Sequence, residues 1–205
     1  MSIIQKLGED NIKLIAKPSF VDTNKAEFQE ALAKFVLNNS RTEARRNGSR
    51  TVEKITNDCI RGLVAEFAFK QIEGVEDSSP LVNDIRELEY ARMMVDQKLD
   101  GYRFQTKSTT GNSKYWSFNQ NQCRSISHSS QYNDFFLVIA VNKETDDKWL
   151  AVPRLLIDAH HISRGIQKSQ YNAGFYFNPE HSKKFCIQLT NYLKLDRIKE
   201  LEECT

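Results

Sequence analysis

The sequence lacks the features that mark membrane-spanning and exported proteins. Its longest uninterrupted apolar run, Phe135 to Val141, has seven residues, whereas a helix that crosses a bilayer needs about 20. Charged residues follow Met1 within a few positions, so no apolar core of a signal peptide is present. We therefore expect a soluble protein that has no membrane partner.

Several common cofactor motifs are also missing. The four cysteines are scattered, with no CxxC pair and no spacing typical of a disulfide scaffold, which favours a reduced, cytoplasmic protein. The eight glycines form neither a GxGxxG motif nor a Walker-type phosphate loop. The four histidines have no HxxxH or HExxH spacing, so the sequence does not indicate a histidine metal site.

Acidic residues are absent between Gly101 and Asn133, although the net charge of the whole chain is only +2. This stretch combines basic, aromatic and amide side chains, which suit phosphate backbones and base edges; a polar loop followed by a solvated helix is the alternative. A second basic segment, before residue 51, is either a clamp on a DNA backbone or a solvated linker. The candidate DNA-binding residues of the two segments are Arg41, Arg45, Arg46, Arg50, Arg103, Lys114, Asn119, Gln120, Gln122 and Arg124.

The length of 205 residues suits one α/β domain with an appendage. We expect a basic helical extension over residues 1–50 and a main domain over residues 51–205. Helical spacing or a polar context predicts helices over residues 25–38, 51–72, 84–94, 119–130, 154–160 and, at the C-terminal end, 186–203. Strands are predicted over residues 135–141 as a buried central strand, 149–152 ending at Pro153, and 174–177 as an edge strand.

Asp100-Gly101 is a strong signal for the turn of a β-hairpin, because both residue types tolerate the positive φ angles of a type I′ turn. With these two residues at the tip, Asp96 lies opposite Gln105. Cross-strand partners project from the same face of a sheet, and Lys107 shares that face because it is two residues after Gln105. A carboxylate, a carboxamide and an ammonium group are therefore expected to converge on one patch.

This set of groups suits a divalent cation held against a phosphodiester. Mg²⁺ prefers hard oxygen ligands, typically one or two carboxylates, and neutralises charge on phosphoryl oxygens. We expect Asp96 to anchor Mg²⁺, or Mn²⁺ as a substitute, with the side-chain carbonyl of Gln105 and the backbone carbonyl of Thr106 as further ligands. Lys107 is expected to hold the attacking water or the scissile phosphate.

One sequence pattern resembles the PD-(D/E)xK nuclease superfamily: Asp96, eight further residues, Gln105-x-Lys107 and then a buried strand. The likeness covers residues 50 to 155 and includes Glu66, since many members carry a glutamate on the preceding helix. It implies a restriction-endonuclease-like core, with a mixed central sheet of four or five strands flanked by helices. It also implies that Glu66, Asp96, Gln105 and Lys107 are catalytic, with Glu66 either as a further metal ligand or as a carboxylate that supports the ligands.

Two positions depart from the family pattern. Val95 stands where the family's proline would be, and Gln105 replaces an acidic residue, as happens in some homing endonucleases and Mrr-type restriction enzymes. The second replacement removes one negative charge, which favours one tightly held ion over two.

Together these features predict a metal-dependent endodeoxyribonuclease of the type II restriction or homing type. Cutting both strands of double-stranded DNA with one active site per chain favours a homodimer. Two alternatives stay open. One is a nucleic-acid-binding module with the same fold and no competent metal site, and the other is a nuclease specific for a DNA or RNA structure.

Overall fold

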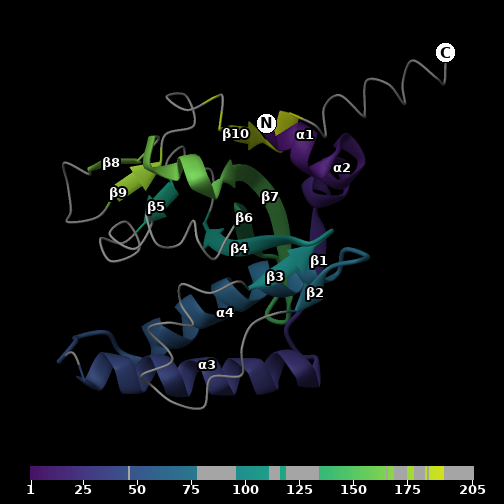
Figure 1. Cartoon of the computed structure of the whole chain (residues 1–205). Helices are drawn as coiled ribbons and strands as arrows, with labels where there is room; N and C mark the ends of the chain where they lie inside the picture. Colours follow the sequence, from purple (N-terminus) through teal and green to yellow (C-terminus); the bar gives the residue numbers. More distant parts are fainter. Residues whose placement is uncertain are drawn as a thin grey trace.

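The computed structural model describes residues 1–45, 47–77, 96–110, 116–118, 134–164, 166–168, 175–177, 183 and 185–191. Figure 1 shows the arrangement of the elements. In chain order these are α1 (Ile3–Leu7), α2 (Glu9–Ala16), β1 (Ser19–Asp22), α3 (Ala26–Arg45), α4 (Val52–Lys70), β2 (Glu76–Asp77), β3 (Gln97–Leu99), β4 (Tyr102–Thr109), β5 (Trp116–Phe118), β6 (Phe135–Lys143), β7 (Lys148–Asp158), the 3-10 helix η1 (Ala159–Arg164), β8 (Ile166–Lys168), β9 (Phe175–Phe177) and β10 (Cys186–Gln188).

A mixed β-sheet forms the centre of an α/β fold, as the sequence predicted. Its described strands run in the order β1-β7-β6-β4-β3-β2, and β10 also pairs with β7. Strands β4 and β6 are parallel, whereas the other pairs in this sheet are antiparallel. The predicted number of four or five strands is wrong, because the sheet has seven described strands. The sequence did not predict β1 and β10, two short strands from segments near the two ends of the chain, which both pair with β7.

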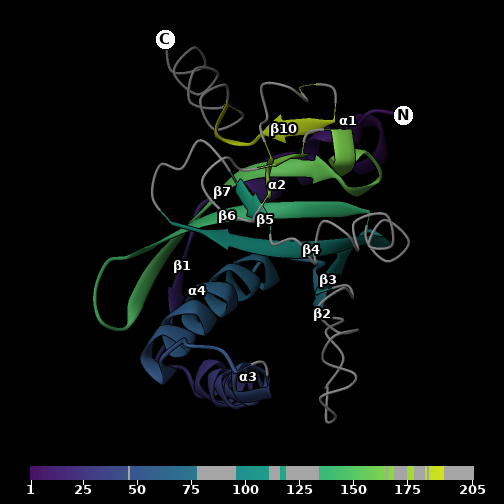
Figure 2. The same ribbon diagram turned by 90° about the vertical axis from the view of Figure 1, so that its left-hand side faces the viewer.

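Helix α4 covers one face of the sheet, and α3 packs against the opposite side of α4 (Figures 1 and 2). The Thr51 hydroxyl caps α4 by accepting a hydrogen bond from the Lys54 amide at 3.2 Å. Leu63 and Phe69 are buried, and the ring centroid of Phe69 lies 5.0 Å from that of Phe104 in β4. The helix predicted over residues 51–72 is thus confirmed, and its apolar stripe faces the sheet.

The first 50 residues contribute to the same hydrophobic core as the rest of the chain. Ile12 and Ile15 of α2 are fully buried, as is Phe28 of α3. Strand β1 pairs with β7, residues 19–22 lying opposite residues 148–151. The segment predicted as an extension therefore supplies an edge strand and two short helices, and α3 continues beyond the predicted end at residue 38.

Strand β6 is the buried central strand that the sequence predicted. It lies between β4 and β7, and every residue from Phe135 to Val141 is buried. Such a run, apolar at successive positions, indicates a strand that is covered on both faces.

Strand β7 continues through Pro153 to Asp158, so the predicted strand end and the predicted helix over residues 154–160 are wrong. The pairing with β1 reaches Ala151, and the pairing with β10 starts at Leu155. Pro153 therefore lies between these two partners, where its missing N–H removes no hydrogen bond to either. The pairing of β6 with β7 shifts register at the same place, as a β-bulge does.

Two predictions near the C-terminal end are wrong in part, and residues 192–203 of the predicted C-terminal helix lie outside the described residues. Residues 186–188 form β10 rather than the start of a helix, because the edge of β7 offers backbone partners over Leu155–Ile157. The strand predicted at residues 174–177 exists as β9 but is the middle strand of a second sheet, β5-β9-β8, rather than an edge. The helices predicted over residues 84–94 and 119–130 lie outside the described residues.

Candidate functional site

The β3–β4 hairpin has the predicted turn and register. Asp100 and Gly101 at its tip have φ angles of 50° and 76°, the left-handed values that a type I′ turn requires. Leu99 pairs with Tyr102, and two residues further from the tip Gln97 pairs with Phe104. Regular pairing stops there, immediately after Asp96 in the direction of the chain.

Asp96 continues the contact with β4 through its side chain. Its backbone amide donates to the Phe104 carbonyl at 3.0 Å, and its Oδ2 accepts a hydrogen bond from the Thr106 amide at 2.8 Å. In a regular ladder a carbonyl of the neighbouring strand would accept that bond. The Asp96 carboxylate therefore lies against the edge of β4 at the point where β3 begins.

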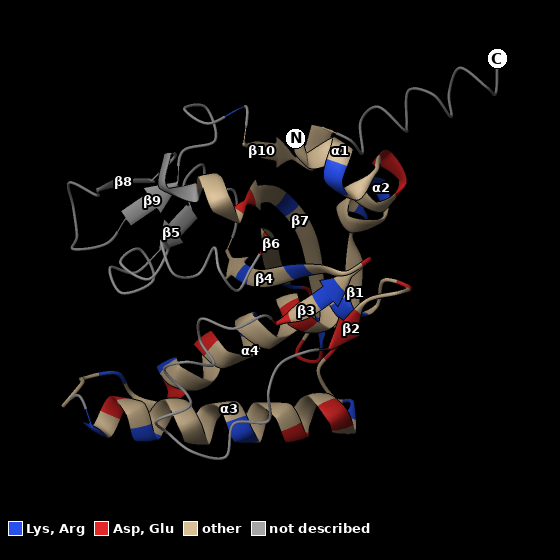
Figure 3. Ribbon diagram, viewed as in Figure 1, with Lys and Arg blue, Asp and Glu red and all other residues tan. Residues whose placement is uncertain are grey.

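Three charged side chains interact electrostatically: Glu66 in α4, Asp96 immediately before β3, and Lys107 in β4. Burial raises the pKa of the Glu66 carboxyl well above its usual range; the charge of Asp96 raises it further, and Lys107 opposes both effects. Burial raises the pKa of Asp96 to about 6, although the Lys107 ammonium and the hydrogen bond from the Thr106 amide both lower it. Two repelling carboxylates and one ammonium group thus interact where α4 meets the β3–β4 hairpin. Figure 3 shows acidic and basic positions on these neighbouring elements.

The predicted neutral ligands lie on the same strand. Side chains alternate along β4, so Gln105 and Lys107 share the face opposite to that of Phe104, which packs towards α4. Gln105 is buried and pairs with Phe136 of β6. The N–H and C=O of a strand residue point to the same side, which directs the Thr106 carbonyl toward the edge where its amide meets Asp96.

Gln97 is a site residue that the sequence interpretation missed. It is only 2% exposed, and its carboxamide joins α4 to β4. Its Nε2 donates to the backbone carbonyl of Glu66 at 2.9 Å, and its Oε1 accepts from the Thr106 hydroxyl at 3.0 Å. The signal was present in the hairpin register, which places a polar residue on the same face as the core residue Phe104.

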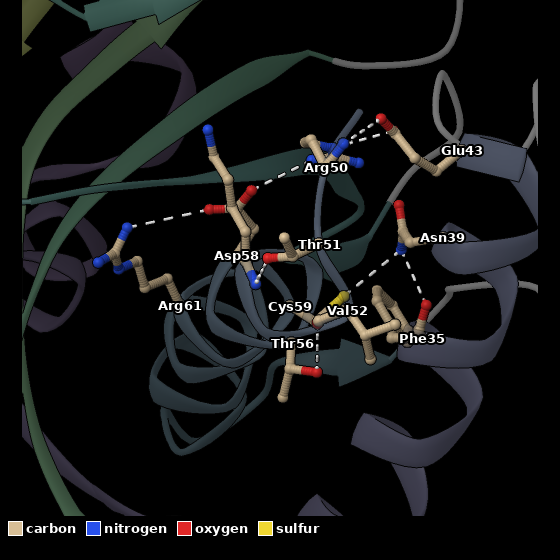
Figure 4. Close-up of polar contacts among 11 residues, drawn as sticks. Phe35, Asn39, Glu43, Arg50, Thr51, Val52, Thr56, Asp58, Cys59 and Arg61 are labelled. Atoms are coloured by element: carbon tan, nitrogen blue, oxygen red, sulfur yellow. Dashed lines mark hydrogen bonds and ion pairs between the residues drawn. The ribbon is translucent and has the colours of Figure 1, made fainter. Parts of the chain in front are cut away.

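The arginines predicted to clamp DNA are not part of this cluster. Arg41 and Arg45 are exposed in the last turns of α3. Figure 4 shows Arg50 between two carboxylates: its Nε donates to Glu43 at 3.0 Å and its Nη1 donates to Asp58 at 3.1 Å. These ion pairs join the end of α3 to the start of α4, which gives Arg50 a role in the packing of the two helices. A role in DNA binding stays a prediction for all three arginines.

Arg103 likewise has an intramolecular partner. Its backbone amide and Nε donate to Oδ2 of Asp134 at 2.9 and 3.0 Å, and its Nη2 donates to Oδ1 at 3.1 Å. The Asp134 amide returns a bond to the Arg103 carbonyl at 2.9 Å. Burial alone would raise the pKa of the Asp134 carboxyl, but the hydrogen bonds and charge of Arg103 lower it overall. This forked pair connects the start of β4 with the start of β6.

The lowered pKa of Asp134 predicts a pH-dependent contribution to stability. A carboxyl that ionises more readily in the folded state stabilises the fold above its unfolded pKa, and the contribution is lost as the pH falls through its folded pKa. We expect Asp134→Asn to lower the free energy of unfolding at pH 7 by about 1 kcal/mol. Urea unfolding of both proteins should show the difference disappearing below about pH 4. A difference that persists in acid contradicts this account of the pair.

The remaining predicted DNA-binding residues lie outside the described residues. These are Arg46, Lys114, Asn119, Gln120, Gln122 and Arg124. Within the part of the chain that the structure describes, no three His, Cys, Asp or Glu side chains form a group that could hold a metal ion. No helix in that part is long and apolar enough to cross a membrane.

Comparisons of the chain with protein-family models, with curated proteins and with solved structures found no match.

Proposed function

We propose that this protein is a Mg²⁺-dependent endonuclease that hydrolyses phosphodiester bonds of double-stranded DNA. The observation that carries the proposal is the electrostatic interaction of Glu66 in α4, Asp96 immediately before β3 and Lys107 in β4. The pKa values of both carboxyls are raised, which means that keeping the two groups ionised next to each other costs free energy. Such an arrangement is common at functional sites.

The donor groups around Asp96 fit a divalent cation. Ionised Glu66 and Asp96 leave the cluster with one net negative charge after Lys107 is counted, and a cation would relieve the repulsion between the carboxylates. Carboxylate oxygens, together with the Gln105 and Thr106 carbonyl oxygens proposed from the sequence, are the hard ligands that Mg²⁺ prefers. Two carboxylates rather than three agree with a site for one ion.

Each of these residues would have a distinct role in hydrolysis. Glu66 and Asp96 would hold Mg²⁺, which when bound neutralises charge on the phosphoryl oxygens and helps the leaving oxygen. Lys107 carries a compact positive charge on the same face of β4 as Gln105. We assign it to the scissile phosphate or to the orientation of the attacking water.

The resemblance to the PD-(D/E)xK superfamily is also part of the proposal. Helix α4 carries Glu66, the β3–β4 hairpin carries the other residues, and β6, parallel to β4, is the long buried strand. A restriction-endonuclease-like core built from α4, β3, β4, β6 and β7 is therefore part of the proposal. Cleavage of both strands would need two sites, so we also propose a homodimer, which analytical ultracentrifugation tests.

The proposal is tested by cleavage of supercoiled plasmid with Mg²⁺ or with EDTA. We expect nicked or linear products only with Mg²⁺ or Mn²⁺. A protonated carboxyl does not bind a cation, the pKa of Asp96 is raised to about 6 and that of Glu66 is raised well above its usual range. The rate at limiting Mg²⁺ should therefore rise at least about 10-fold per pH unit below pH 6, and level off only when both carboxyls are ionised. Higher Mg²⁺ should move this midpoint to lower pH. Cleavage that survives EDTA contradicts the proposal.

A DNA-binding module without catalytic activity is the second candidate. The neutral Gln105 favours it, because an amide in place of a carboxylate weakens the affinity for a cation. Salt-sensitive DNA binding with no cleavage in Mg²⁺ or Mn²⁺ would support this candidate. The same assays with branched DNA and RNA distinguish a structure-specific nuclease from both.

A further inference from the structure

We infer that Gln97 is a positioning residue that holds Asp96, Glu66 and the Gln105–Lys107 segment in register for the proposed reaction. The inference rests on the proposed function, and it adds to the site a residue that touches neither the metal nor the substrate.

The Gln97 carboxamide is bonded at both ends. Its Nε2 donates to the backbone carbonyl of Glu66 at 2.9 Å, and its Oε1 accepts from the Thr106 hydroxyl at 3.0 Å. The backbone of Gln97 pairs with Phe104 of β4. One side chain thus connects α4, which carries Glu66, with the strand that carries Gln105 and Lys107.

The position of Gln97 in the chain makes this connection specific to the site. Asp96 precedes it directly, and the Thr106 residue that bonds the Gln97 side chain also donates its amide to Asp96 Oδ2 at 2.8 Å. Thr106 is therefore hydrogen-bonded to both of the adjacent residues Asp96 and Gln97. Movement of the Thr106 side chain would also shift the hydrogen bond that orients the Asp96 carboxylate.

Burial explains why a glutamine is needed. At 2% exposure water cannot replace a lost partner, so an apolar residue would leave the Thr106 hydroxyl without its acceptor. A glutamate would accept from that hydroxyl but would place a third negative charge against Glu66 and Asp96. Only an uncharged side chain with both a donor and an acceptor satisfies both neighbours.

The first test is amide hydrogen exchange measured by NMR, which needs neither metal nor activity. We expect the Thr106 amide in Gln97→Met to exchange about 10-fold faster than in the wild type, relative to the Leu137 amide in the centre of the sheet. The matched control is Gln29→Met, because the Gln29 carboxamide also donates to a backbone carbonyl, that of Thr23 at 2.7 Å, away from the site. An unchanged relative rate for Thr106 in Gln97→Met overturns the inference.

The second test is kinetic and uses Thr106, whose replacement perturbs the core less. Thr106→Val removes the hydroxyl that Gln97 binds, and Thr106→Ser keeps it. We expect Thr106→Val and Gln97→Met each to lower kcat by about 10-fold with KM for DNA unchanged, and Thr106→Ser to restore at least half of the wild-type kcat. A rise in KM alone, or no rescue by serine, also counts against positioning. Wild-type protein that cuts no nucleic acid defeats the proposed function, whereas the exchange test still decides the role of Gln97.

Discussion

Lys107→Ala lowers kcat for Mg²⁺-dependent DNA cleavage by about 1000-fold if the proposed function is correct. The Lys107 ammonium is the positive charge that lowers the pKa of both Glu66 and Asp96. The removal of one electrostatic contact to the reacting phosphate has an effect of about 100- to 1000-fold. The loss should appear in single-turnover cleavage of a DNA duplex at saturating protein, so that weaker binding does not contribute. Asp96→Ala should lower kcat by a similar factor.

The control for this experiment is Lys98→Ala, on the neighbouring strand of the same hairpin. Lys98 pairs in register with Arg103 and with Glu76 of β2, whereas the lysine that lowers the pKa of both Glu66 and Asp96 is Lys107. The removal of Lys98 therefore changes the positive charge of the hairpin by the same amount. We expect its single-turnover rate to stay within about twofold of the wild type. Equal losses in the two lysine variants would show that Lys107 acts only through general attraction of DNA. Unchanged rates in both Lys107→Ala and Asp96→Ala would remove the assignment.

Asp96→Asn increases the stability of the folded protein at pH 8. The raised pKa of Asp96 means that the folded state binds its proton more tightly than the unfolded state does. The wild type therefore loses stability as the pH rises from about 4 to above 6, and the loss is complete above the folded pKa. An asparagine carbonyl still accepts the Thr106 hydrogen bond and carries no charge, so we expect a gain on the order of 2 kcal/mol at pH 8 and none below pH 4.

Thermal unfolding measures this gain as an increase in Tm of roughly 5 °C. Added Mg²⁺ should stabilise the wild type by mass action and leave Asp96→Asn almost unaffected. Asp134→Asn is the matched control, because the same substitution at a carboxyl whose pKa is lowered should change Tm in the opposite direction. A lower Tm of Asp96→Asn at pH 8 would show that the ionised carboxylate stabilises the fold, contrary to its proposed role as a metal ligand that lowers stability.

The parts of the site that depend on local structure were predictable. The Asp100-Gly101 turn determines the pairing of its two flanking strands, and side-chain alternation then places Gln105 and Lys107 on one face. Apolar spacing likewise predicted α4 and the position of Glu66 beside its buried stripe. Both predictions use only interactions between residues close together in the chain.

The ion pairs of the arginines were not predictable in this way. Arg50 meets Glu43 and Asp58, and Arg103 meets Asp134, in each case a carboxylate from another element. A basic segment in a sequence shows available charge but not which carboxylates will neutralise it. For the same reason the two-sided role of Gln97 appears only when α4 lies beside β4.

The sequence by itself determined the hairpin register, the helix before it and the buried strand after it, because turn geometry and apolar periodicity act over a few residues. Only the tertiary structure decided that β7 continues past Pro153, that residues 186–188 form a strand, and that two carboxylates share one partly buried environment. Each of these depends on what the neighbouring element offers: a free strand edge in the first two cases, and loss of water around like charges in the third. Such neighbours come from distant parts of the chain, and no local pattern specifies them.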